Sequence, residues 1–66
     1  MFSRGLRKLR ADKQLTQTEL AERVGISQTM ISEYEKGRKK PTLDVVVLIA
    51  DTLRCSVDDL LERRVS

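Results

Sequence analysis

The sequence predicts an all-α fold, a compact bundle of five short helices. Three observations indicate it: apolar residues recur at helical spacing, hydroxyl residues that can cap a helix precede the apolar runs, and compact turns separate them. The chain has 66 residues, of which 39% are hydrophobic and 35% charged, the balance of a globular protein. We therefore expect one domain over residues 1–66, without a linker or an internal repeat.

The first two helices follow from apolar spacing and from a capping motif. A helix over residues 3–13 is predicted by an apolar stripe at i, i+4 and i+7, formed by Phe2, Leu6 and Leu9. Residues 16–19 read Thr-Gln-Thr-Glu, a capping box whose hydroxyl and carboxylate each accept a hydrogen bond from a backbone amide. The second helix therefore begins at Thr16. It ends at Gly25, where a residue in the left-handed conformation can close it.

The third and fifth helices are predicted from the residues at their ends. Ser27 caps a helix over residues 27–36, and Gly37 closes it. Ser56 opens a short last helix over residues 56–63. Two carboxylates follow Ser56 in the first turn, where the helix dipole favours negative charge.

The fourth helix, from its cap Thr42 to Arg54, contains six consecutive apolar residues at positions 45–50. This run is rich in β-branched residues, and periodicity alone also allows a buried strand. No second strand is present to pair with it, and an unpaired strand would leave its backbone groups unsatisfied. We therefore predict a helix that is apolar on most sides and central to the bundle.

The composition excludes several kinds of chemistry. Histidine is absent and Cys55 is the one cysteine, so a His/Cys metal cage, a Ser-His-Asp triad and an internal disulfide are excluded. Cys55 fits a small core residue, and the adjacent pair Asp58 and Asp59 fits helix capping better than catalysis. We expect no enzyme activity, catalytic residue, metal, cofactor or small-molecule ligand.

The chain also lacks the segments that direct a protein to or across a membrane. No apolar run reaches the roughly 18 residues of a membrane span, and residues 1–10 lack the apolar core of a secretory signal. We expect a cytoplasmic, nucleoid-associated protein without membrane contact.

The charge is distributed unevenly along the chain. The formal net charge is +3, but residues 1–40 hold ten basic and five acidic residues, whereas residues 41–66 hold three and five. A basic portion of a folded domain is typical of proteins that bind polyanions, although a solvated charged face is the alternative.

The second and third helices, joined by a short turn that contains Gly25, have the pattern of a DNA-binding helix-turn-helix. The sequence around them resembles the phage repressor and Cro-like (XRE-type) helix-turn-helix family from about Leu6 to Leu61. The segments that carry the resemblance include Leu15-Thr16-Gln17-Thr18-Glu19-Leu20-Ala21, Val24-Gly25-Ile26-Ser27-Gln28, Ile31-Ser32, Tyr34-Glu35-Lys36-Gly37-Arg38, Pro41-Thr42-Leu43 and Ile49-Ala50-Asp51-Thr52-Leu53. It implies a lambda-repressor-like DNA-binding domain of five helices, with the third helix in the major groove of double-stranded DNA.

The predicted base-reading residues share the outer face of the third helix, opposite Ile31 and Tyr34 on a helical wheel. A glutamine amide offers a donor and an acceptor that match the adenine edge, and a threonine can contact a thymine methyl group. A glutamate would accept a hydrogen bond from cytosine or would point away from phosphate, and the alternative for the whole face is simple solvation. The predicted readers are Gln28, Thr29, Ser32 and Glu33.

The predicted phosphate contacts lie at the start of the second helix and after the third. Gln17 is one residue inside its helix, where unpaired amides and the positive end of the dipole favour an anion. The basic residues follow the recognition helix, and the alternative is again an ordinary solvated surface. These predicted contacts are Gln17, Lys36, Arg38, Lys39 and Lys40.

Two further expectations concern structure and assembly. In the resembled family, residues that match Arg10 and Glu35 often form a partly buried ion pair between the first and third helices. On the last helix, one apolar stripe is larger than a short helix needs for its own core, which predicts a dimer interface. The alternative is that the whole stripe packs beneath the first and fourth helices. The stripe consists of Val57, Leu60, Leu61 and Val65.

The sequence thus predicts a bacterial or phage transcriptional regulator that binds a pseudo-palindromic operator as a homodimer. A repressor and a restriction-modification controller both fit the chain. One alternative is an antitoxin that acts with a toxin partner. Another is a protein-interaction module with the same fold, although its recognition face should be apolar.

Overall fold

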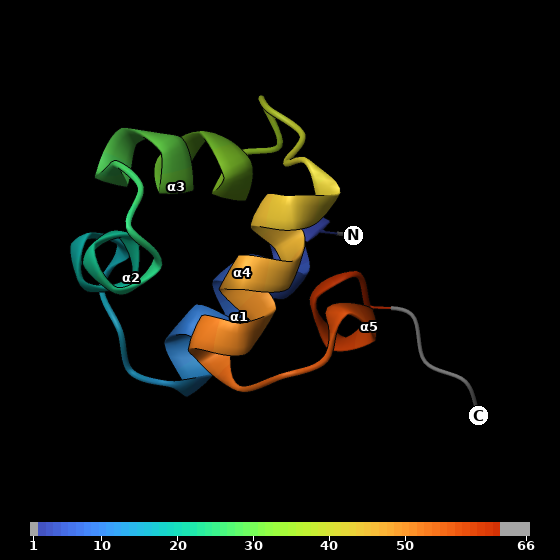
Figure 1. The fold of residues 1–66 in the computed structure, drawn as a ribbon. Helices are drawn as coiled ribbons and strands as arrows, with labels where there is room; N and C mark the ends of the chain where they lie inside the picture. The colour runs from blue at the N-terminus through green and yellow to red at the C-terminus, as the bar shows by residue number, and fades with distance from the viewer. Residues whose placement is uncertain (1, 63–66) are drawn as a thin grey trace.

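The computed structural model describes residues 2–62, and within them it contains five α-helices and no strand (Figure 1). The helices are α1 (Phe2–Asp12), α2 (Gln17–Val24), α3 (Gln28–Glu35), α4 (Leu43–Leu53) and α5 (Val57–Leu60). The predicted all-α, five-helix fold is confirmed.

The predicted caps are present at the start of the helices. Thr16 accepts a hydrogen bond from the Glu19 amide at 3.0 Å, and the Glu19 carboxylate accepts one from the Thr16 amide at 2.9 Å, which completes the capping box of α2. The pKa of Glu19 is lowered, because both Thr16 groups favour its charged form. The side-chain oxygens of Ser27, Thr42 and Ser56 accept a hydrogen bond from the backbone amide three residues later and so cap α3, α4 and α5, and α5 also has a capping box, with Asp59.

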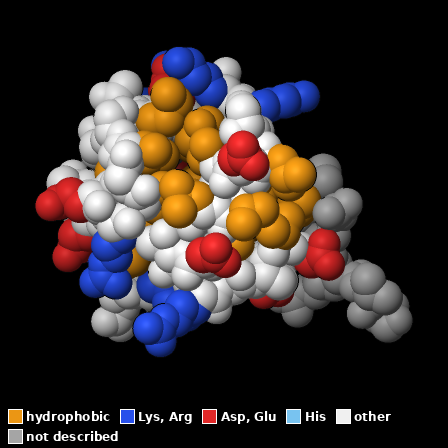
Figure 2. All heavy atoms as spheres, in the orientation of Figure 1, with side chains coloured by type: hydrophobic (Ala, Val, Ile, Leu, Met, Phe, Trp, Pro, Cys, Tyr) orange, Lys and Arg blue, Asp and Glu red, His pale blue; other side chains and the backbone are white. Residues whose placement is uncertain are grey.

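The apolar run of α4 is helical, as predicted, but only one face of the helix packs against the core. One face is buried and consists of Val46, Ile49, Ala50 and Leu53. The other face leaves Leu43, Val47 and Leu48 exposed by 71%, 42% and 44%. Figure 2 shows hydrophobic side chains on the face of the molecule that α4 occupies in Figure 1, with separate acidic side chains among them. The helix therefore covers the core from outside and is not central to it.

The last helix is shorter than predicted. It was expected over residues 56–63, but α5 ends at Leu60. The chain turns away at Glu62, which has a φ of 56°, a left-handed conformation that stops a helix. Residue 63 lies outside the described residues.

All five helices contribute to one core. The largest fully buried side chains are Leu6, Leu20, Ile31, Ile49, Leu53 and Leu60. Gly5 allows α1 and α5 to meet closely, since a Cβ atom at this position would lie 1.9 Å from the backbone oxygen of Leu60. Tyr34 packs into the same core and contacts Phe2 edge to face.

The helix-turn-helix is formed by α2 and α3, as predicted. Gly25 has a φ of 88° and donates a hydrogen bond from its amide to the Ala21 oxygen at 2.8 Å, which ends α2. Only Ile26 and the cap Ser27 separate this glycine from α3. In Figure 1, α2 and α3 lie on one side of α1 and α4, and α5 lies on the other.

Candidate nucleic-acid interface

The side chains of α3 divide into an inner and an outer set. Ile31, Tyr34 and Glu35 are buried. Of the four predicted base readers, Gln28 and Thr29 are exposed, and Ser32 and Glu33 are half-buried. The structure therefore places all four outside the core.

The ion pair implied by the family resemblance is formed in the structure. Arg10 donates from Nε and Nη2 to the two carboxylate oxygens of Glu35, at 2.5 Å and 3.0 Å. Its Nη1 also donates to the backbone oxygen of Leu15, at 2.8 Å. Glu35 is only 4% exposed, and its hydrogen bonds raise the pKa of Arg10 above the ordinary value. The pair ties α1 and the start of α2 to the inner face of α3.

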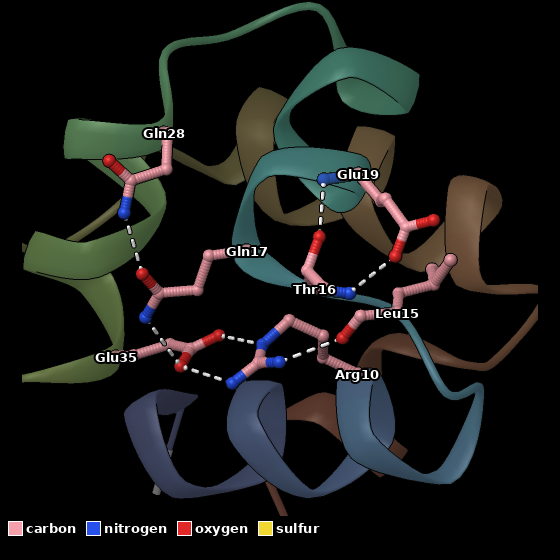
Figure 3. A network of polar contacts seen from close by, with 7 residues as sticks. All are labelled: Arg10, Leu15, Thr16, Gln17, Glu19, Gln28 and Glu35. Carbon is pink, nitrogen blue, oxygen red and sulfur yellow. Dashed lines mark hydrogen bonds and ion pairs between the residues drawn. The ribbon is translucent and has the colours of Figure 1, made fainter.

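A chain of hydrogen bonds runs from this ion pair to the surface (Figure 3). Gln17 Nε2 donates to Glu35 Oε1 at 3.1 Å, and Gln28 Nε2 donates to Gln17 Oε1 at 2.7 Å. These contacts orient the Gln28 amide from the core outward. They use one N–H of Gln28, so its oxygen and its second N–H remain available for other hydrogen bonds.

Sequence reasoning assigned Gln17 only to a phosphate and missed its place in this chain. The structure shows its amide hydrogen-bonded to both Glu35 and Gln28, which leaves one of its two N–H groups outside this chain of contacts. No spacing rule identifies the link, because residues 17, 28 and 35 meet only through the packing of α2 against α3.

A basic loop follows α3. Gly37 has a φ of 74° and reverses the chain, and the Arg38 amide donates to the Glu33 backbone oxygen at 3.0 Å. This turn places a cluster of exposed cations beside the C-terminal end of α3: Lys36, Arg38, Lys39 and Lys40. The predicted phosphate contacts, apart from Gln17, are therefore grouped at the C-terminal end of α3.

The apolar residues predicted for a dimer interface have different surroundings. Leu60 is fully buried in the core of its own chain, so it cannot lose further surface to a second copy, and its assignment to the interface is wrong. The reason is that Gly5 allows α5 to sit directly on α1. Val57 and Leu61 are half-buried, and Val65 lies outside the described residues.

Other kinds of site find little support in residues 2–62. Cys55 is half-buried against the core, and its pKa is raised first by burial and then by the nearby Asp59 charge, which disfavours a reactive thiolate. This part of the chain has no cluster of three or more side chains able to hold a metal ion. None of its helices has the length and apolar character needed to cross a bilayer.

Comparison with known protein families agrees with the geometry of α2 and α3. The Helix-turn-helix family model matches residues 6–60, which is most of the chain. The chain belongs to this family. Proteins similar to this chain are described as HTH-type transcriptional regulators and as phage repressors.

Individual relatives show the same relationship. The HTH-type transcriptional regulator YobD of Bacillus subtilis is 41% identical over 61 residues, which cover 92% of this chain and 54% of YobD. The clp gene regulator ClgR of Corynebacterium glutamicum has a TM-score of 0.87 at 37% identity, over 94% of this chain and 66% of that one. The P22 c2 repressor, solved with a synthetic operator, has a TM-score of 0.87 at 26% identity, over 97% of both chains. The chain spans about half the length of the curated relatives it matches, such as YobD.

Proposed function

We propose that this protein is a transcriptional regulator that binds a pseudo-palindromic DNA operator in the cytoplasm, as a homodimer, and reads it with the outer face of α3. The observation that carries this proposal is the orientation of Gln28. Its amide is exposed, yet it is held through Gln17 by a carboxylate that is buried and paired with Arg10. Side chains fixed in advance lose less conformational entropy on binding, so such an amide suits specific recognition.

The chemistry of the side chains on this surface separates base contacts from phosphate contacts. Gln28 would pair with the edge of an adenine, while Thr29 and Ser32 would contact bases nearby. The second N–H of Gln17 and the cations Lys36, Lys39 and Lys40 would contact phosphates, which position the duplex but carry no sequence information.

A homodimer follows from the geometry of DNA. A two-fold dimer presents two recognition helices about 34 Å apart, one turn of the duplex, and so binds two symmetric half-sites. In Figure 1, α5 lies on the side of the molecule opposite α2 and α3. Contact through the α5 side would leave both reading faces open. The P22 c2 repressor, which has the same fold, was solved in complex with a synthetic operator, and this supports operator binding by the present chain.

The test is selection of DNA sites from a random duplex library, followed by binding titrations on the selected site. We expect one pseudo-palindromic sequence to be enriched, and Gln28→Ala to lose roughly 1–3 kcal/mol on that site, the energy of a bidentate base contact. Thr29→Val should change the preferred base at one position. Thr52→Val is the matched control, since Thr52 lies on α4 and bonds to its own helix backbone.

Loss of a phosphate contact should affect DNA binding differently from loss of a base contact. Lys40→Ala should weaken binding to all sequences alike and should reduce the dependence of affinity on salt by about one phosphate contact. An absence of any enriched site, together with unchanged binding by Gln28→Ala, would rule out the proposed function.

A further inference from the structure

One carboxylate, that of Glu33, lies near the cations that follow α3. Of the two acidic residues in α3, Glu35 is buried and paired with Arg10, whereas Glu33 lies on the outer side and is 27% exposed. Glu33 forms an ion pair with Arg38, whose Nη1 atom lies 3.8 Å from Glu33 Oε2. The guanidinium that the basic loop would offer to a phosphate thus already faces a negative charge of its own chain.

The backbone builds this contact. Gly37 adopts the left-handed conformation, and the Arg38 amide donates to the Glu33 backbone oxygen at 3.0 Å, which fixes the start of the Arg38 side chain next to Glu33. Lys39 and Lys40 follow directly, are exposed, and have no ion-pair partner among the described residues. The pairing is therefore a local property of Arg38 and not of the whole basic loop.

We propose that Glu33 acts as an electrostatic brake on Arg38 and is not a base reader. The inference rests on the proposed function, because it concerns how this surface meets DNA. A phosphate that approaches Arg38 must replace the Glu33 carboxylate, and it leaves that carboxylate unpaired beside a polyanion. Glu33 thereby lowers the affinity for every duplex by about one phosphate contact and limits binding to non-specific DNA, which is almost wholly electrostatic.

The proposal differs in a measurable way from the reading role first predicted for Glu33. A cytosine reader contributes favourable, sequence-dependent contacts, so its loss weakens binding and changes the preferred base. A brake on Arg38 makes an unfavourable contribution that is independent of sequence and exists only while Arg38 is present.

A double-mutant cycle on Glu33→Gln and Arg38→Met tests the brake. Binding of the full chain to a mixed-sequence duplex of about 20 base pairs is measured by fluorescence anisotropy at several salt concentrations. We expect Glu33→Gln to tighten binding about two- to fivefold, the range set by an exposed ion pair. We also expect it to steepen the slope of log affinity against log salt by up to about 0.9. In the Arg38→Met background the same substitution should change neither quantity.

Lys39→Met provides the matched background, because it removes a neighbouring cation that Glu33 does not hold. There the gain from Glu33→Gln should persist. If the gain also persists in Arg38→Met, Glu33 acts by general repulsion and the brake is wrong; if Glu33→Gln weakens binding or changes the selected sequence, Glu33 is a reader and the brake is equally wrong. Failure of the wild-type chain to bind any duplex would instead overturn the proposed function itself. Thermal melts of each variant confirm that the fold is intact.

Discussion

At the scale of single residues, the buried carboxylate of Glu35 connects stability to recognition. It accepts hydrogen bonds from Arg10 Nε and Nη2 and from Gln17 Nε2, while only 4% of the residue is exposed. Removing one partner of a buried pair is costly, because the other charge is left without compensation. The same carboxylate is the inner end of the chain that orients Gln28, so its loss should affect DNA binding as well.

Glu35→Gln should therefore destabilise the protein by about 2–4 kcal/mol, somewhat less than for a fully buried pair because Arg10 is 21% exposed. Urea unfolding measures this change. Glu22→Gln is the control, since Glu22 is an exposed residue of α2 and its substitution should change stability by less than about 0.5 kcal/mol. Where the variant remains folded, its DNA affinity should fall as in Gln28→Ala. A loss of stability below about 1 kcal/mol would show that the ion pair does little for the fold.

At the scale of the helices, the end of α4 is held by a residue under strain. Arg54 has φ and ψ of 54° and 47°, and its amide donates to the backbone of Ala50 and Asp51. This left-handed conformation costs an L-residue roughly 1–2 kcal/mol, whereas glycine adopts it without a penalty from a Cβ atom.

Arg54→Gly should consequently stabilise the protein, by about 0.5–1 kcal/mol once the greater freedom of glycine in the unfolded chain is subtracted. For a chain of this size the melting temperature should rise by a few degrees, roughly 2–8 °C. Arg54→Ala separates the two causes, because it also removes the long charged side chain but keeps the Cβ atom. If the alanine variant gains as much stability as the glycine variant, backbone strain is not the reason.

The sequence predicts helices well where the determining contacts are local. The capping box of Thr16 and Glu19 joins residues three positions apart, and the structure forms it as expected. The burial of Leu60 depends instead on a contact between distant residues. A Cβ atom at Gly5 would lie 1.9 Å from the backbone oxygen of Leu60, and the spacing of these two residues in the sequence does not predict that approach. The assignment of Leu60 to a dimer interface failed for this reason.

The same difference between local and long-range contacts applies to the outer face of α3. The outward position of Thr29 follows from helical periodicity, which a wheel captures. The link from Gln17 to Gln28, and the pairing of Glu33 with Arg38, arise from helix packing and from the reversal of the chain at Gly37. The sequence alone can predict that such side chains lie on the surface. Their hydrogen-bond and ion-pair partners depend on the tertiary structure and cannot be predicted from it.

At the scale of the whole molecule, two apolar surfaces could form the interface of the proposed dimer. One is the exposed face of α4, with Leu43, Val47 and Leu48. The other is the α5 side, where Val57 and Leu61 are half-buried. The first surface exposes more apolar area but also carries Asp44 and Asp51, one turn before and one turn after its centre. A two-fold contact centred on α4 would bring these like charges together, which disfavours it.

The α5 side also carries carboxylates, Asp58 and Asp59, but it lies opposite α2 and α3 (Figure 1), so contact through it would leave both outer α3 faces open. Leu61→Asp should therefore weaken the dimer by at least about tenfold, because a two-fold interface contains the substitution twice and must desolvate both carboxylates. Sedimentation at several protein concentrations measures the dissociation. Leu48→Asp, an equal change on the exposed face of α4, should leave the dimer intact. Leu61→Asp should still bind an isolated half-site, since its reading face is unchanged, but it should lose the affinity gained from two linked half-sites. Dissociation by Leu48→Asp and not by Leu61→Asp would place the interface on α4, and the repulsion between Asp44 and Asp51 would then have to be relieved by contacts across the two-fold axis.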